Sequence, residues 1–180
     1  MYEVEIKIPA DLERVRNRLD ELEATSTDAV VQADTYYDAP HRSFPETDEA
    51  LRIRSERPEN GAEVTRLTYK GPLVDDESKT REEIETAVGD DEKADAILTK
   101  LGFDAAATVR KDRERFALEG YTITLDSVDG VGEYVEVETE VETEADLESA
   151  RDGAYDVLER LELDPDEQLR TSYLGLLLES

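Results

Sequence analysis

Acidic and basic side chains recur at every second position in several short stretches of this sequence. Glu3, Glu5 and Lys7 follow this spacing near the start, and Glu136 and Glu138 follow it again far along the chain. Carboxylate oxygens are the ligands that hard divalent cations such as Mg²⁺ and Mn²⁺ prefer, and Arg and Lys side chains neutralise phosphate oxygens. A site that combines both groups would hold a metal-bound triphosphate.

Basic residues are scarce in the sequence, yet several of them share strand faces with carboxylates. The chain contains 21 Lys and Arg residues against 48 Asp and Glu residues, a formal net charge of -27. Charge on one exposed strand is ordinary, but a surface built to be acidic would not gather its few cations in this way. A lumen in which acidic and basic groups face each other explains both sets. The cations are Lys7, Arg52, Arg54, Lys70, Arg81, Lys111 and Arg113, and the carboxylates are Glu3, Glu5, Glu83, Glu85, Asp126, Glu136 and Glu138.

Eight segments of the sequence have the alternating pattern that is typical of β-strands with one buried face. Most of them carry one apolar face and one face of ionisable side chains. The predicted strands are Tyr2–Ile8, Val30–Tyr37, Leu51–Ser55, Glu63–Lys70, Arg81–Glu85, Val109–Leu118, Tyr121–Asp126 and Glu133–Val141.

Apolar residues at helical spacing predict a helix after the first strand and further helices over Asp91–Leu101 and from Thr143 to about Leu163. Thr143 is predicted to cap the last of these. A short terminal helix is predicted over Asp166–Leu178. The segment Asp38–Glu49 is predicted to be a long loop, in which the only histidine, His41, is expected to be exposed rather than to act as a general base.

Two architectures agree with this pattern of strands and helices. In the first, an open sheet carries helices on one side and exposes its charged faces to solvent. In the second, the sheet closes into a barrel with a charged lumen and an apolar outside that the helices cover. We predict the second, an α+β fold built on an eight-stranded antiparallel β-barrel. The chain has no internal repeat or flexible linker, which predicts a single domain over residues 1–180.

The composition excludes several classes of partner and chemistry. Nucleic acids and anionic membranes are themselves negative, so we expect neither as a partner, and phosphate chemistry needs a local basic site. Cysteine is absent, which excludes disulfides, thiolate metal sites and cysteine nucleophiles. No apolar run approaches the length needed to span a bilayer, and we expect a cytoplasmic protein. The acidic excess predicts a surface adapted to molar salt.

The motifs and their order resemble the CYTH family, which includes class IV adenylate cyclases and thiamine or inorganic triphosphatases. The segment from Glu3 to Lys7 resembles the N-terminal ExExK signature of that family. Similar motifs follow in the family's order along essentially the whole chain. They are Gln32–Asp38, Leu51–Arg54, Thr68–Pro72, Arg81 with Glu83 and Glu85, Lys111–Arg113, Asp126, Glu136–Glu138 and Ser172–Tyr173. The family fold is an eight-stranded antiparallel tunnel, which agrees with the barrel predicted from alternation.

The resemblance implies a role for each group of charged residues. The implied ligands of Mg²⁺ or Mn²⁺ are Glu3, Glu5, Asp126, Glu136 and Glu138. The implied substrate-binding residues are Arg52, Arg54, Lys70, Arg81, Lys111 and Arg113. Lys7 and Arg81 would orient phosphates or carboxylates, and Glu3, Glu5 and Lys7 are the catalytic candidates. The alternative for Arg81, Glu83 and Glu85 is a structural ion-pair network within the lumen.

Two kinds of enzyme and one binding module would share these ligands. The segment Asp34–Arg54 resembles the cyclase branch, so the first hypothesis is conversion of ATP to cyclic AMP and pyrophosphate. The alternative is a triphosphatase acting on tripolyphosphate, thiamine triphosphate or a nucleotide. A non-catalytic module that binds triphosphate is the third hypothesis, although anion binding alone needs no cluster of carboxylates. The resemblance is compatible with a homodimer, and no sequence pattern locates an interface.

Overall fold

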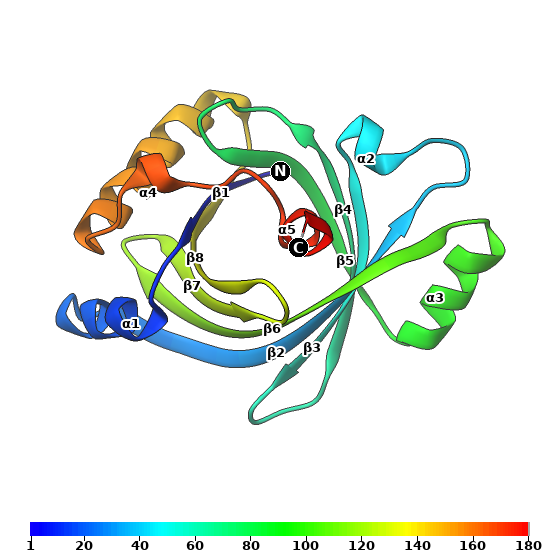
Figure 1. The fold of residues 1–180 in the computed structure, drawn as a ribbon, viewed down its shortest axis with the longest axis horizontal. Coiled ribbons are helices and arrows are strands. Elements are labelled where there is room, and N and C mark those ends of the chain that lie inside the picture. The colour runs from blue at the N-terminus through cyan, green and yellow to red at the C-terminus, as the bar shows by residue number, and fades with distance from the viewer. Residues whose placement is uncertain (180) are drawn as a thin grey trace.

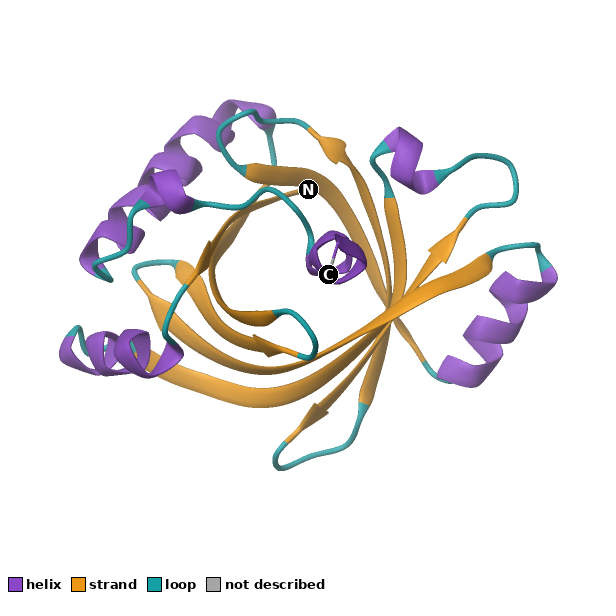
Figure 2. Cartoon of the chain, viewed as in Figure 1, coloured by secondary structure: helices purple, strands orange, loops and turns teal. Residues whose placement is uncertain are grey.

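The computed structural model, which describes residues 1–179, contains a closed antiparallel β-barrel of eight strands. The order around the barrel is β1-β5-β4-β3-β2-β6-β7-β8, and pairing of β1 with β8 closes the ring. Figures 1 and 2 show this ring and the helices around it. The predicted barrel is therefore confirmed. The strands are β1 (Tyr2–Pro9), β2 (Thr25–Asp38), β3 (Ala50–Pro58), β4 (Val64–Leu73), β5 (Lys79–Val88), β6 (Asp104–Leu118), β7 (Tyr121–Val128) and β8 (Gly132–Val141).

Two neighbouring strands begin earlier than the sequence pattern predicts. β2 begins at Thr25 instead of Val30, and β6 begins at Asp104 instead of Val109. The two strands pair with each other over most of their length, so each extends the ladder of the other. The added segments are polar or rich in alanine and lack the apolar alternation that reveals a strand. Pairing with the neighbouring strand extends these strands beyond their apolar pattern.

The hydrophobic core lies outside the barrel wall, between the strands and two helices. The helices α1 (Leu12–Glu21) and α4 (Leu147–Arg160) cover the outer faces of β1, β7 and β8. Each fully buried aliphatic side chain in this layer contributes roughly 1.5–3 kcal/mol by leaving water. The apolar strand faces point outward, and the charged faces are therefore left to the lumen. The buried residues of this core include Ile6, Ile8, Leu19, Ile123, Leu125, Val135, Val137, Val157 and Leu158.

The α-helix predicted to begin at Thr143 begins at Leu147 instead. A 3₁₀ turn, η1 (Glu144–Asp146), precedes α4. The Thr143 hydroxyl donates to the carboxylate of Asp146 at 2.7 Å and makes no capping bond to a helical N–H. The N–H of Asp146 also returns to the Thr143 carbonyl at 3.2 Å. These contacts close a three-residue turn, which explains why the first turn is 3₁₀ rather than α.

The terminal helix predicted over Asp166–Leu178 is divided into two parts. The first is a 3₁₀ turn, η2 (Pro165–Glu167), and the second is α5 (Tyr173–Glu179). Between them the chain runs beside β1, where the N–H of Leu169 donates to the carbonyl of Lys7 at 2.8 Å. Pairing with the barrel keeps this segment extended and prevents a continuous helix.

Short helices lie at the ends of the strands. The predicted loop Asp38–Glu49 contains α2 (Phe44–Thr47), and α3 (Asp91–Lys100) connects β5 to β6. The Asp38 carboxylate accepts the N–H of the first residue of α2 at 2.8 Å, which orders the loop. His41 is exposed, as the sequence predicts.

Helix α5 lies across one opening of the barrel. Figure 1 shows α5 inside the ring of strands. Tyr173 of α5 packs with the buried residues Val109 of β6 and Val128 at the end of β7. Leu174, Leu176 and Leu177 of α5 belong to the same apolar cluster, so α5 narrows this opening with apolar side chains.

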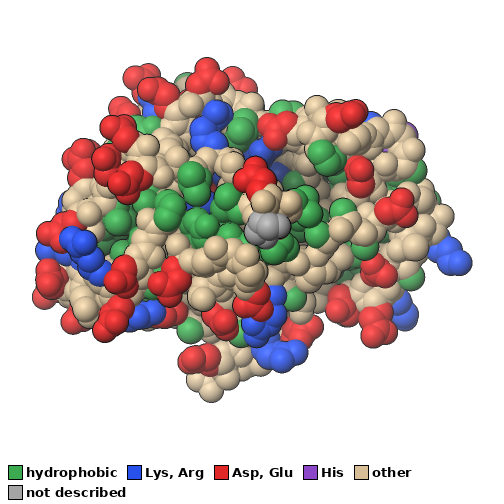
Figure 3. All heavy atoms as spheres, viewed as in Figure 1, with side chains coloured by type: hydrophobic (Ala, Val, Ile, Leu, Met, Phe, Trp, Pro, Cys, Tyr) green, Lys and Arg blue, Asp and Glu red, His purple; other side chains and the backbone are tan. Residues whose placement is uncertain are grey.

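Acidic side chains are spread over the outer surface, while hydrophobic side chains gather near the barrel opening in the same view (Figure 3). The predicted adaptation to molar salt rests on this composition and stays a prediction. None of the helices within residues 1–179 is long and apolar enough to cross a membrane.

Candidate active site

A cavity of about 310 Å³ opens beside α5 and extends into the lumen. A cavity of this size accommodates a small organic ligand. Every predicted site residue except Lys7 and Asp126 lines it. The ionisable lining residues include Glu3, Glu5, Arg52, Arg54, Lys70, Lys79, Arg81, Lys111, Arg113, Glu136 and Glu138.

Glu3, Glu5 and Glu138 form a cluster, the carboxylate trio, on the wall made by β1 and β8. The register of these strands sets Glu5 directly opposite Glu138, and Glu3 follows two residues away on the same face of β1. One carboxylate oxygen from each residue lies within 4.8 Å of the other two. Oxygen ligands that converge in this way suit Mg²⁺ or Mn²⁺. The residues present therefore fit the metal that the sequence predicts.

Two lysines hold two members of the carboxylate trio. Lys70 Nζ donates to Glu3 Oε2 at 2.5 Å, and Lys79 Nζ donates to Glu5 Oε1 at 3.0 Å. Both lysine side chains are at most 11% exposed. Within residues 1–179 no lysine or arginine nitrogen lies within 4.0 Å of the Glu138 carboxylate. Glu138 is therefore the member of the trio that has no direct cationic partner.

The three carboxyl groups differ in their tendency to ionise. Burial and the nearby Glu3 carboxylate raise the pKa of Glu138 to about 8. Burial also opposes ionisation of Glu3, but the Lys70 ammonium outweighs it and the pKa of Glu3 falls to about 2. Lys79 likewise outweighs burial and holds the pKa of Glu5 well below its ordinary value. A divalent cation would favour the ionised form of all three groups.

Asp126 and Glu136, the other two predicted metal ligands, are paired with Arg113. Arg113 donates two hydrogen bonds to Asp126 and one to Glu136, each at 2.6 Å. Burial opposes ionisation of Asp126, but Arg113 outweighs it and lowers the pKa of Asp126. Burial and Glu5 instead raise the pKa of Glu136 well above its ordinary value. The structure thus brings three of the five predicted ligands together and pairs the other two with an arginine.

Lys7, a predicted catalytic residue, lies behind Tyr173. It is fully buried, and its Nζ lies 4.0 Å from the centre of the Tyr173 ring and donates to the carbonyl of Thr171 at 2.9 Å. The Tyr173 hydroxyl donates to Asp126 at 2.7 Å. Burial lowers the pKa of Lys7 to about 8, although Glu136, 3.8 Å away, favours its charge. In this arrangement Lys7 anchors the C-terminal segment to the lumen.

A second buried cluster joins Asp34, Arg54 and Lys111. Asp34 is fully buried and accepts two hydrogen bonds from Arg54 at 2.7 Å and one from Lys111 at 3.0 Å. Burial opposes ionisation of Asp34, but Arg54 and Lys111 hold its pKa well below the ordinary value. Burial lowers the pKa of Lys111 to about 7. One carboxylate therefore fixes the positions of two predicted substrate-binding cations.

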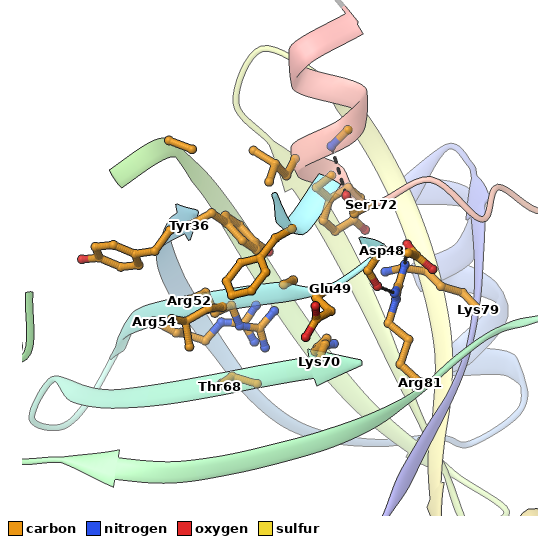
Figure 4. A pocket seen from close by; sticks show the side chains of 18 of the residues that line it. Tyr36, Asp48, Glu49, Arg52, Arg54, Thr68, Lys70, Lys79, Arg81 and Ser172 are labelled. Carbon is orange, nitrogen blue, oxygen red and sulfur yellow. Dashed lines mark hydrogen bonds and ion pairs between the residues drawn. The ribbon is translucent and has the colours of Figure 1, made fainter. Parts of the chain in front are cut away.

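Arg52 has a different environment from the other buried cations. Within residues 1–179 no carboxylate oxygen lies within 4.0 Å of its guanidinium, and its buried Nε has no hydrogen-bond partner. Burial opposes its charge, but Asp34 and Tyr36 outweigh burial and raise its pKa. Figure 4 shows the side chains of Arg52 and Arg54 running beside each other into the cavity. Arg52 can therefore bind an anion without first breaking an ion pair.

Arg81 lines the cavity, but its donors hold the loop that precedes β3. It donates to the carbonyl of Asp48 at 2.8 Å and to its carboxylate at 2.9 Å, a contact visible in Figure 4. Glu83 lies 3.5 Å from Lys70 of β4, and Glu85 accepts from Thr68 of β4 at 2.8 Å. Among the described residues, Arg81, Glu83 and Glu85 thus each pair with a charged residue, namely Asp48, Lys70 and Arg66, and the structural ion-pair network that the sequence allowed stays a prediction.

Aromatic and aliphatic side chains form another part of the lining, which we call the apolar wall. They come from β2, β3, α2 and α5, and these two helices flank the opening. Its residues are Tyr36, Tyr37, Phe44, Leu51, Leu174 and Leu178. Such a wall suits an uncharged organic group.

Sequence reasoning missed three residues of this site: Lys79, Asp34 and Tyr173. Lys79 lies two residues before Arg81 on the same face of β5, so a strand predicted one repeat longer would have included it. Asp34 and Tyr173 both lie in motifs that resemble the family, and Asp34 alternates with Tyr36. No signal in the sequence indicates that Tyr173 enters the lumen, because this depends on where the C-terminal segment folds back.

Proteins related to this chain match it over nearly its whole length. The CYTH domain family matches residues 1–173. A Methanocaldococcus jannaschii protein named as a putative adenylate cyclase is 38% identical over 177 residues, which cover 98% of each chain. The adenylate cyclase CyaB of Aeromonas hydrophila is 26% identical over 145 residues, 81% of this chain and 71% of the relative.

Solved structures share the fold. A protein from Pyrococcus horikoshii OT3 superposes with a TM-score of 0.92 at 40% identity, over 98% of each chain. A Hippeastrum protein, described as a putative adenylyl cyclase with a dominant triphosphatase activity, superposes with a TM-score of 0.67 over 99% of this chain and 95% of its own. Its 17% identity shows a common fold alone.

Proposed function

This chain belongs to the CYTH domain family, and from that premise we propose that it is a metal-dependent enzyme that converts ATP to cyclic AMP and pyrophosphate in its barrel lumen. The observation that carries the proposal is that one cavity is lined both by the carboxylate trio and by buried cations. The two relatives named above as adenylate cyclases support this choice of reaction.

The carboxylate trio and the arginines Arg52 and Arg54 occupy different walls of the barrel, while Lys70 and Lys79 pair with the trio itself. The carboxylate trio lies on β1 and β8, which are neighbours, while Arg52 and Arg54 lie on β3, separated from β1 by β5 and β4. Lys111 and Arg113 lie on β6, beyond β2. A triphosphate in the cavity would therefore have metal ligands on one side and cationic donors on the other, which is the distribution that a metal-bound polyanion requires.

The proposed reaction needs charge neutralisation and alignment more than proton-transfer chemistry. A bound Mg²⁺ or Mn²⁺ would supply a Lewis acid to the phosphate oxygens and the attacking hydroxyl. Arg52 and Lys111 would neutralise oxygens of the leaving pyrophosphate, and Glu3, Glu5 and Glu138 would hold the metal. The ribose 3′-oxygen forms a bond to the α-phosphorus, the bond to the bridging oxygen breaks, and the hydroxyl proton goes to pyrophosphate or water.

The apolar wall favours a substrate with an organic group over inorganic tripolyphosphate. Tyr36 and Phe44 offer aromatic faces at the opening, and Leu174 and Leu178 of α5 add aliphatic surface. A purine base can stack on such aromatic rings and leave water, whereas tripolyphosphate has no group that would use them. This supports ATP as the substrate.

Product identification tests the proposal. The protein is incubated separately with ATP and with tripolyphosphate in molar KCl containing Mn²⁺ or Mg²⁺, and the products are identified by mass spectrometry. We expect cyclic AMP and pyrophosphate from ATP and no product when EDTA is added. Tight triphosphate binding that persists in EDTA, without any product, would instead indicate a non-catalytic binding module.

A triphosphatase is the second candidate, because the same ligands would serve attack by water on the terminal phosphorus. The Hippeastrum neighbour, which shares the fold, is described as having a dominant triphosphatase activity. Orthophosphate released from tripolyphosphate, with no cyclic AMP from ATP, would replace the cyclase by this alternative.

Replacing Arg52 by glutamine is expected to weaken substrate use without weakening the fold. A charge-assisted hydrogen bond contributes roughly 1.5–3 kcal/mol, so we expect kcat/KM for ATP to fall about 10- to 100-fold in Arg52→Gln. The thermal midpoint should not fall, because no carboxylate of the described residues depends on this guanidinium as an ion-pair partner. Steady-state kinetics and thermal unfolding measure the two effects.

The matched control is Arg66→Gln on the neighbouring strand β4. Arg66 is 37% exposed, and its contacts with Glu56 and Glu85 are 3.9 Å and 3.5 Å long. We expect less than a twofold change in kcat/KM for this variant. Equal losses in both variants would show that total lumen charge matters and that Arg52 has no specific contact with the substrate.

A further inference from the structure

Lys79 lies between a predicted metal ligand and the cavity. The register of β5 and β1 sets Lys79 directly opposite Glu5. Its Nζ donates to Glu5 Oε1 at 3.0 Å, and the two side chains are only 10% and 4% exposed. Lys79 also lines the cavity, where Figure 4 shows it near Arg81. The same ammonium can therefore reach a carboxylate of the trio and a ligand in the cavity.

A metal ion at the carboxylate trio and the Lys79 ammonium would compete for Glu5. Both are cations, and their repulsion is strong in a buried site where water does not screen it. The Lys79 Nζ donates to the Glu5 carboxylate, and this contact favours the charged ammonium. A protonated amine has no lone pair with which to bind the metal. Metal binding would therefore push the Lys79 ammonium away from Glu5.

A phosphate is the acceptor that suits the displaced ammonium. The nearby carboxylates have other partners: Glu136 is bound by Arg113 and Asp48 by Arg81. Lysine is a flexible chain with three donors, so its head group can turn without any movement of the strand. Phosphate oxygens of a triphosphate in the cavity would accept these donors.

We propose that Lys79 exchanges Glu5 for a phosphate oxygen of the bound triphosphate when a divalent cation binds to the carboxylate trio. This inference rests on the proposed function, because it requires that metal and triphosphate share the cavity. The exchange links the two binding events: metal binding releases a donor for the phosphate, and phosphate binding removes a competitor of the metal. The coupling must be reciprocal, so each ligand raises the affinity for the other by the same factor.

The test measures two affinities by isothermal titration calorimetry with the full chain. The first is that of Mn²⁺ alone, and the second is that of diimidotriphosphate at saturating Mn²⁺, a probe whose P–N–P bridges resist cleavage. Lys79→Gln removes the charge but keeps a donor for Glu5. We expect it to bind Mn²⁺ about tenfold more tightly and diimidotriphosphate about tenfold more weakly than the wild type, an effect within the usual range of coupling between sites.

Two further variants keep the test specific. Lys79→Arg retains the positive charge and should keep the wild-type affinity for Mn²⁺ within about threefold. Arg115→Gln removes a cation elsewhere in the lumen, where Arg115 pairs with Glu56 and Asp28, and should change neither affinity more than twofold. Lys79→Met replaces the glutamine variant if thermal unfolding shows that the latter is not folded.

The outcomes separate this inference from the proposed function. Opposite changes of the two affinities in the neutral variant, absent from both controls, support the exchange. If Mn²⁺ binding is unchanged or weaker in the folded neutral variant, or if it tightens while diimidotriphosphate binding is unaffected, the exchange is wrong. A wild type that binds neither Mn²⁺ nor diimidotriphosphate would overturn the proposed function itself.

Discussion

Replacing Glu138 by glutamine is expected to lower turnover at least about 100-fold while the barrel stays as stable as the wild type. Glutamine has the same shape but lacks the charge that a divalent cation needs. Within residues 1–179 Glu138 has no ion pair to lose, and it faces Glu5 across the β1–β8 ladder. Burial and the nearby Glu3 raise the pKa of Glu138 and disfavour its charge, so a neutral amide at this position should leave the thermal midpoint unchanged or raise it. Turnover of ATP with Mn²⁺ and thermal unfolding in EDTA measure the two effects.

Glu140→Gln is the matched control for this prediction. Glu140 lies two residues further along β8, on the same face but exposed. We expect its turnover to stay within twofold of the wild type. Retention of turnover in Glu138→Gln would remove Glu138 from the metal site, and a large loss of stability would show that its carboxylate has a structural partner.

Replacing Asp34 by asparagine is expected to cause the largest loss of stability in the lumen. Asp34 is fully buried and is the shared partner of Arg54 and Lys111, so the variant leaves two buried cations without their carboxylate. Breaking a buried ion pair on one side costs about 3–5 kcal/mol. Urea unfolding at pH 7 should show a decrease of this order in the free energy of unfolding. A decrease below about 1 kcal/mol would show that Asp34 does not hold the cluster together.

The effect should depend on pH in a defined direction. Since the pKa of Asp34 in the folded protein lies well below its ordinary value, the stabilisation by its carboxylate is present above the unfolded pKa, about 3.9. It is lost as the pH falls through the lower folded pKa. The difference between wild type and Asp34→Asn should therefore be constant near neutral pH and shrink below about pH 4.

Asp28→Asn provides the control on the same strand. Asp28 also pairs with an arginine, Arg115, at 2.9 Å, but its side chain is 42% exposed. Exposed ion pairs contribute about 0–1 kcal/mol, so this variant should be nearly neutral. Equal losses in the two variants would mean that burial does not explain the contribution of Asp34.

The alternation of side chains was sufficient to predict which faces of the strands are charged. It placed Glu3 and Glu5 on one face of the first strand, and a repeated charged face on several strands predicted a barrel with a charged lumen. Alternation reports the face of each residue and not its partner on the next strand. The meeting of Glu5 with Glu138 depends on the register between the first and last strands, which no local pattern determines.

Strand register, which alternation does not reveal, also explains why the predicted metal ligands have different partners. Asp126 and Glu138 carry the same chemistry, but the β6–β7 register sets Asp126 opposite Arg113. The position of Tyr173 over Lys7 depends on a contact between the two ends of the chain. Lys79 was missed for a local reason, because the apolar alternation of its strand is weak where it begins.

The proposed function requires that one metal ion and a triphosphate share the cavity, with the metal on Glu3, Glu5 and Glu138. Anomalous diffraction from crystals grown with Mn²⁺ and diimidotriphosphate tests it most directly. We expect an anomalous peak at coordinating distance from all three carboxylates, with phosphate density between this peak and the guanidinium of Arg52. A peak elsewhere, or a triphosphate bound without contact to the metal, would contradict it.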